Sequence, residues 1–272
     1  MKKQPISYYK ERARDALRKQ WGINAGLVLL AYLITTVIQS SVDGLLNFPE
    51  GSRGQLISDF LLSNLLLFAF YYGLNYIALY VIRGGRAKPG MLFAIFDKKY
   101  YLPMLLLNLI STVATWLVNS LVFLPLIFMG GVFSYVQLVT GNSPRLFLSN
   151  DFVIDFNFII MIFIFLLVAL MLLNIIGGLF QIASWVKLDY PELSVGKSIS
   201  YAWFLLKDRL WKYILLQLSF IGWYLISVLT LFIGLLWVVS YVNVSMAAFY
   251  DYAREEKGMP ERYLNSQKET LV

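Results

Sequence analysis

Five long stretches of the chain carry no charged side chain, and short charged segments separate them. A helix of about 20 apolar residues is long enough to cross the hydrocarbon core of a bilayer. Each stretch reaches that length, so the pattern predicts an all-α membrane protein. The stretches are Gly22–Val42, Phe60–Ile82, Tyr101–Pro144, Phe156–Val186 and Tyr213–Tyr250.

The lengths of the stretches predict about six transmembrane helices. The fifth stretch has 38 residues and fits two helices joined by a tight turn near Thr230 to Gly234. In the third, Pro125 and the pair Gly130-Gly131 predict a span that ends before a short outer-face or re-entrant segment. We expect one polytopic domain over residues 1–272, with spans at about 22–42, 60–82, 101–123, 157–186, 212–229 and 232–250 and a cytoplasmic tail at 251–272.

Composition supports a membrane protein. The chain is 59% hydrophobic and 14% charged, whereas soluble domains carry about a quarter charged residues. Basic residues are distributed unevenly, since 21 of the 23 flank alternate ends of the expected spans and only Arg53 and Arg145 fall in the other two loops. Because Lys and Arg set membrane orientation, this predicts that both termini lie in the cytoplasm.

Three basic segments share a design that suggests a threefold helical-hairpin repeat. Each has an apolar residue, a charged run and then an aromatic residue or Leu that opens a span, and each predicts an amphipathic helix at the inner interface before spans one, three and five. They are Leu17–Trp21, Phe96–Tyr100 and Leu206–Leu210. The alternative is that any basic helix before a span looks this way.

Two apolar stripes define these interfacial helices. Their basic faces would contact anionic lipid head groups, or the stripes would pack on the protein's own bundle. Four tryptophans at the expected inner boundaries fit an aromatic belt. The stripes are Ile6, Tyr9, Ala13 and Leu17, and Val195, Ile199, Trp203, Leu206 and Leu210; the tryptophans are Trp21, Trp185, Trp203 and Trp211.

Catalytic chemistry is not indicated. The chain has no His and no Cys, and no Asp, Glu, Lys or Arg lies inside the five stretches. Thiol and imidazole nucleophiles, histidine metal ligands and buried proton relays are therefore excluded, and we expect no catalytic residue, no cofactor and no metal. The net charge of +7 comes from basic residues that flank apolar runs, which does not indicate nucleic acid.

Amides are the main polar groups inside the stretches, and six are candidate intramembrane polar contacts: Asn64, Asn75, Asn108, Asn119, Asn174 and Gln181. Asn64 and Asn75 are 11 residues apart, as are Asn108 and Asn119, so each pair would share a helix face. Since the two spans run in opposite directions, we expect bridges from Asn75 to Asn108 and from Asn64 to Asn119. The alternative is a polar track for a substrate.

Small residues favour close helix packing at Gly22 with Gly26 and at Ala69 with Gly73. Gly177-Gly178 could mark local unwinding in the fourth span.

Several short motifs along the chain are typical of one membrane family. They are Leu218–Trp223, Gly234–Tyr241, Ala247–Tyr250, Asp189–Ser200, and Ala13 and Arg14 with Leu17 and Trp21. Through them the chain resembles a bacterial integral membrane family, common in Firmicutes, known as domain of unknown function 975. The resemblance implies a bacterial cytoplasmic membrane location and transfers no catalytic residues.

Two functions are compatible with these patterns. The first is a non-enzymatic accessory or envelope factor that binds anionic lipid at the inner face, another membrane protein or a second copy of itself. The second is a transporter or channel for a small or amphipathic solute, which would use the amide-lined faces.

Overall fold

The computed structural model describes residues 4–139, 156–260 and 263, with side chains given outside 122–162. Every regular element in these residues is helical. The α-helices are α1 (Ile6–Leu17), α2 (Trp21–Leu46), α3 (Arg53–Leu62), α4 (Phe68–Ile82), α5 (Lys98–Val139), α6 (Phe156–Asp189), α7 (Val195–Leu206), α8 (Leu210–Leu218), α9 (Ile221–Leu229) and α10 (Leu235–Lys257). A π-helical turn, η1 (Ser63–Leu67), joins α3 to α4, and η2 (Pro89–Phe96) and η3 (Lys207–Arg209) are 3-10 helices.

Five segments of the described chain are long and apolar enough to cross a membrane, so the chain is a helical membrane protein. They are Trp21–Leu46, Arg53–Ile82, Lys98–Leu121, Phe163–Asp189 and Val195–Leu229. The expected sixth helix is present as α10, and the turn before it lies between Thr230 and Gly234 as the sequence predicts. α10 is not among these five segments and is buried over most of its length.

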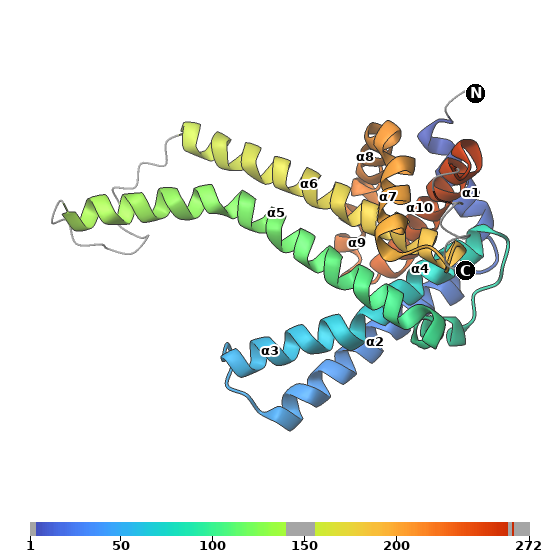
Figure 1. The fold of residues 1–272 in the computed structure, drawn as a ribbon, viewed down its shortest axis with the longest axis horizontal. Coiled ribbons are helices and arrows are strands. Elements are labelled where there is room, and N and C mark those ends of the chain that lie inside the picture. Colours follow the sequence, from blue (N-terminus) through green and yellow to red (C-terminus); the bar gives the residue numbers. More distant parts are fainter. Residues whose placement is uncertain (1–3, 140–155, 261–262, 264–272) are drawn as a thin grey trace, which may run out of the picture. The chain divides into compact units, whose positions relative to one another are not determined.

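The chain forms two compact units. The first contains Met1–Leu109 and Gly178–Val272, and the second contains Ile110–Gly177. In the first unit α10 packs against α1, α2, α4, α7 and α9, while η2 packs against α4 (Figure 1). α10 is therefore the central helix of this unit.

The expected break in the third stretch is wrong, because α5 continues as one helix through Pro125 and Gly130-Gly131 to Val139. Neighbouring groups re-satisfy the backbone that a proline frees in a membrane helix, and glycine weakens a helix by only about 1 kcal/mol. The expected turn at Gly141 to Pro144 lies outside the described residues.

Local unwinding at Gly177-Gly178 is also wrong, since α6 is helical there. A Cβ atom added at Gly178 would meet the ring of Tyr213 at 2.2 Å. Within the first unit, this glycine allows an aromatic ring to lie against the backbone of α6.

The first amphipathic stripe packs on the protein itself, because Tyr9, Ala13 and Leu17 of α1 are buried and α1 contacts α10. α7 buries a face that includes Tyr201 and Leu205, and Trp203 remains exposed. The segment before α5 is the 3-10 helix η2 and not an α-helix. Among the residues of the two stripes, Trp203 is the one left exposed.

Candidate functional site

Three helices of the first unit, α4, α6 and α10, repeat one spacing at their C-terminal ends. In each, an amide side chain precedes a charged side chain by eight residues, which is about 12 Å along a helix. The pairs are Asn75 with Arg83, Gln181 with Asp189, and Asn243 with Asp251. The amides form one polar layer and the charged groups a second, which we call the amide layer and the charged layer.

The amide layer is held together by Gln181. Its Nε2 donates to Oδ1 of Asn75 at 3.3 Å and to Oδ1 of Asn243 at 3.4 Å. Trp185 Nε1 donates to the backbone oxygen of Asn75 at 2.8 Å. Asn75 is 0% exposed, so these bonds lie in apolar surroundings and fix the register of the three helices.

The charged layer is centred on Arg83, which follows the last residue of α4. Its Nη1 and Nη2 donate to the two carboxylate oxygens of Asp189 at 2.7 Å each, and Nη2 also donates to Asp251 at 2.7 Å. Arg254 lies 3.3 Å from Asp189 and 3.4 Å from Asp251. Tyr250 donates from its hydroxyl to Asp189 at 2.8 Å.

Two cations and two anions therefore balance within the charged layer. The side chains of Asp189 and Asp251 are only 9% and 3% exposed. Burial alone would lower the pKa of Arg83. Hydrogen bonds and attraction from the two carboxylates raise it by more, so the pKa of Arg83 lies above its ordinary value. Arg83 stays charged, and the layer links the ends of α4, α6 and α10.

A second set of ion pairs ties the segment after α7 to the end of α10. Arg209 Nη2 donates to Glu256 at 2.6 Å, and Lys257 Nζ donates to Asp208 at 2.6 Å. Arg209 is buried and its guanidinium lies 5.5 Å from the ring centre of Tyr252. η3 is thereby fixed to the central helix.

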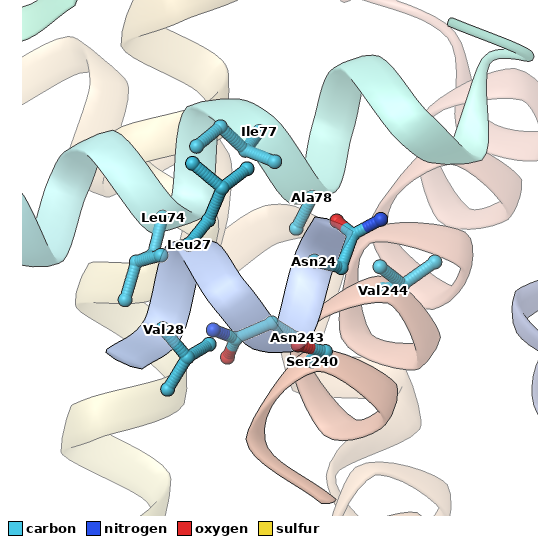
Figure 2. A pocket seen from close by; sticks show the side chains of 9 residues that line it. All are labelled: Asn24, Leu27, Val28, Leu74, Ile77, Ala78, Ser240, Asn243 and Val244. Carbon is cyan, nitrogen blue, oxygen red and sulfur yellow. The ribbon is translucent and has the colours of Figure 1, made fainter. Parts of the chain in front are cut away.

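A cavity between α2, α4 and α10 adjoins the amide layer (Figure 2). Its volume of about 10 Å³ matches roughly one water molecule. Asn243, Ser240 and Asn24 supply its polar lining. The remaining lining residues are Leu27, Val28, Leu74, Ile77, Ala78 and Val244. This cavity is too small for a solute.

The expected bridge between Asn75 and Asn108 is wrong. Asn108 Nδ2 donates instead to Oδ1 of Asn64 at 3.1 Å, while Asn75 accepts from Gln181. Asn64 and Asn75 are 11 residues apart, about 16 Å along a helix, so the level at which α5 begins decides which of them Asn108 meets. η2 packs along α4, and Tyr101 near the start of α5 donates from its hydroxyl to the backbone oxygen of Leu65 at 2.5 Å. α5 therefore begins beside η1 and not beside the end of α4.

Asn119 and Asn174 belong to the second unit. Asn119 is half-buried on α5, and Asn174 is exposed on α6. The bridge from Asn64 to Asn119 joins residues of different units and stays a prediction.

Of the two small-residue motifs, the one that contains Gly73 is closely packed and the one with Gly22 and Gly26 is not. A side chain larger than hydrogen does not fit at Gly73, since a Cβ atom there would meet the backbone oxygen of Leu92 at 2.4 Å. At Gly22 and Gly26 a Cβ atom would meet nothing within 4 Å.

Trp185 is fully buried and is not part of an aromatic belt.

Sequence reasoning missed the charged layer. It counted Arg83 and Arg254 only among the orienting charges and gave no partner to Asp189 or Asp251. The eight-residue spacing after three amides of apolar stretches was the signal that could have revealed the network.

Both carboxylates of the charged layer, Asp189 and Asp251, are ion-paired with Arg83 and Arg254, and these pairs link α4, α6 and α10. Among the residues described, no group of three or more acidic side chains could hold a metal ion.

One family model matches the chain over residues 1–257, and its description is "Protein of unknown function (DUF975)". No curated protein and no solved structure matches the chain.

Proposed function

The chain belongs to the DUF975 family of unknown function, and from this and its inward-turned polar groups we propose a non-enzymatic accessory or envelope factor of the bacterial cytoplasmic membrane. Such a factor acts through its surface, by binding anionic lipid or another membrane protein. It needs neither a catalytic residue nor a path for a solute.

The observation that carries this proposal is that the polar side chains of α4, α6 and α10 bond to one another. Gln181 joins the amides, Arg83 joins the carboxylates, and the adjoining cavity has a volume of only about 10 Å³. These groups stabilise the helices against one another, which leaves the surface as the place where a ligand would bind. The exposed basic residues Arg18 and Lys19 support contact with anionic head groups.

Purification from native membrane in nanodiscs tests the proposal. We expect either a stoichiometric protein partner or enrichment of anionic lipid over the bulk membrane. If lipid is the ligand, Arg18→Gln with Lys19→Gln should reduce the enrichment, since each cation near the surface contributes about 1 kcal/mol. Arg53→Gln is the matched control, because Arg53 is an exposed basic residue in a predicted outer loop.

Recovery of neither a partner nor selected lipid would end this proposal. Solute flux in proteoliposomes that Asn108→Leu or Asn174→Leu abolishes would replace it with the transporter.

A further inference from the structure

α9 and the turn after it expose apolar side chains on nearly every side. Ser227 is the one buried residue of α9. Leu229 and Leu231 are each 83% exposed, and Phe232 and Ile233 are exposed by 60% and 61%. A loop in water would carry polar residues, so this surface is suited to a hydrocarbon solvent.

The backbone of the turn is also suited to hydrocarbon, because its donors are satisfied from within. Phe232 N donates to the backbone oxygen of Ser227 at 2.9 Å, and Gly234 N donates to Thr230 Oγ1 at 2.9 Å. The other backbone N–H groups from Thr230 to Val238 each bond to a carbonyl of the same hairpin. Irregular backbone can enter a bilayer only when its polar groups are paired in this way.

The two residues at the tip of the turn are large and apolar, although their backbone conformation suits glycine or asparagine better. Leu231 and Phe232 have φ angles of 51° and 66°, a region that bulky residues rarely adopt. Glycine or asparagine would relieve this strain at a tip in water. At a tip in hydrocarbon, contact of the two large side chains with lipid outweighs the backbone strain.

The charged helix α1 indicates where the head-group region of the membrane ends and its hydrocarbon core begins. Lys212 of α8 donates to the backbone oxygen of Gln4 at 2.9 Å, and Lys10 donates to the backbone oxygen of Ser219 at 3.2 Å. α1 therefore lies along α8 up to the break before α9. The side chains of Arg14 and Glu11 on α1 are 56% and 62% exposed, which places both helices among head groups and water.

The same level is marked on α10, where Tyr241 lies beside the backbone of Lys10 with its hydroxyl 3.4 Å from that oxygen. Of the segment from α8 to α10, the part that extends beyond this level is the hairpin between Ser219 and Tyr241. α9 has nine residues and is about 14 Å long, about half of the 30 Å hydrocarbon core. Val195–Leu229 is apolar enough for a span, but α8 packs beside α1, and α7 packs against α10, where Lys257 donates to the backbone oxygen of Phe204.

We propose that Ile221–Trp237 is a wedge that inserts among the acyl chains of one leaflet, on the side of α1, and does not cross the membrane. Its partner is the lipid of that leaflet. Both ends of the wedge stay on one side, so the orientation predicted from the basic residues is unchanged.

Cysteine labelling tests this directly, because the chain has no cysteine of its own. Leu231→Cys places a thiol at the tip, Glu50→Cys one in a predicted outer loop, and Arg86→Cys one in a predicted inner loop. With a membrane-impermeant maleimide, we expect Glu50→Cys to react in intact cells and Arg86→Cys only after permeabilisation. Leu231→Cys should react in neither case, and fully only after denaturation.

A nitroxide attached at Leu231→Cys in liposomes gives an independent measure of depth. The wedge predicts frequent collisions with oxygen and few with a water-soluble nickel chelate. Labelling of Leu231→Cys in intact cells would show a complete span, and labelling only after permeabilisation would show a surface hairpin; either overturns the wedge. A nitroxide shielded from both reagents would indicate a protein partner and would also overturn it. None of these outcomes depends on whether a lipid or protein co-purifies with the chain.

Discussion

α9 and the part of α10 up to Tyr250 lie in one charge-free stretch of sequence, yet the two helices have opposite surroundings. α9 is exposed on nearly every side, whereas α10 is buried over most of its length. The difference lies in their polar and small residues. α10 carries Asn243 and Asp251 into the two polar layers and packs through Ala247 and Ala248, whereas the buried polar residue of α9, Ser227, bonds within its own helix.

This comparison shows what hydropathy does and does not determine. Lipid is as apolar as a leucine side chain, so burial of apolar surface does not select which helices associate. Hydrogen bonds, ion pairs and close packing make that choice. α10 has all three and becomes the central helix, and α9 is left to the lipid.

The largest expected effect is loss of the charged layer. Asp251→Ala should lower the free energy of unfolding by about 3–5 kcal/mol, because it leaves Arg83 and Arg254 with one carboxylate between them. Thermal or denaturant unfolding in micelles measures the change. Glu255→Ala, an exposed neighbour on α10, is the control and should stay within about 0.5 kcal/mol. Equal stability of the two variants would contradict the importance of the charged layer.

The second prediction concerns the exposed turn that follows α9. Leu231→Lys places a charge at the tip of the wedge and should cost about 2.5–3.5 kcal/mol of stability in a bilayer, although the side chain it replaces touches little protein. Unfolding in lipid nanodiscs measures the cost. Glu50→Lys, at an exposed turn, should be nearly neutral. A similarly neutral Leu231→Lys would place the tip in water.

The fold could be predicted further than the site. Uncharged length was enough to predict a helical membrane protein and the turn at Thr230 to Gly234, because both depend on local composition. The partner of Asn108 depends on the level at which α5 begins, and η2 sets that level because it packs along α4 before α5 starts. No pattern of apolar residues shows that the chain turns back along α4 in this way.

The charged layer was hidden for a different reason. Arg83 and Asp251 stand at the ends of apolar stretches, where most charges only orient the chain. They become a network because α4, α6 and α10 bring them together across more than 100 residues of sequence. The repeated interval from amide to charge was visible, but its meaning needed the tertiary structure.

Close packing, the third of the interactions that select which helices associate, can be tested at glycines of α4 and α2. Gly73→Ala should cost about 1–3 kcal/mol, because its Cβ would meet the backbone oxygen of Leu92 at 2.4 Å and backbone cannot easily move away. Gly26→Ala in α2 should be neutral or should stabilise by up to about 1 kcal/mol, since nothing lies within 4 Å. Unfolding in micelles separates the two, and a neutral Gly73→Ala would show that η2 is not packed tightly on α4.

The amide layer should contribute less. Asn75→Leu removes the acceptor of Gln181 and should cost about 1 kcal/mol. Because the layer holds helices in register, the amount of lipid or partner bound per folded protein should not change. Co-purification at matched protein level checks this, and a selective loss of binding with normal stability would make Asn75 part of a binding site.

The smallest effect should come from the edge of the buried region, where Arg209 meets Glu256. The hydrogen bond from Arg209 holds the pKa of Glu256 below its ordinary value of 4.5. Its contribution to stability is therefore complete above pH 4.5 and is lost as the pH falls through the lower pKa of the folded state. At a partly solvated site we expect less than about 1 kcal/mol. The difference in unfolding free energy between the wild type and Glu256→Gln should shrink on acidification, and a difference that stays constant with pH would show that this ion pair does not stabilise the end of α10.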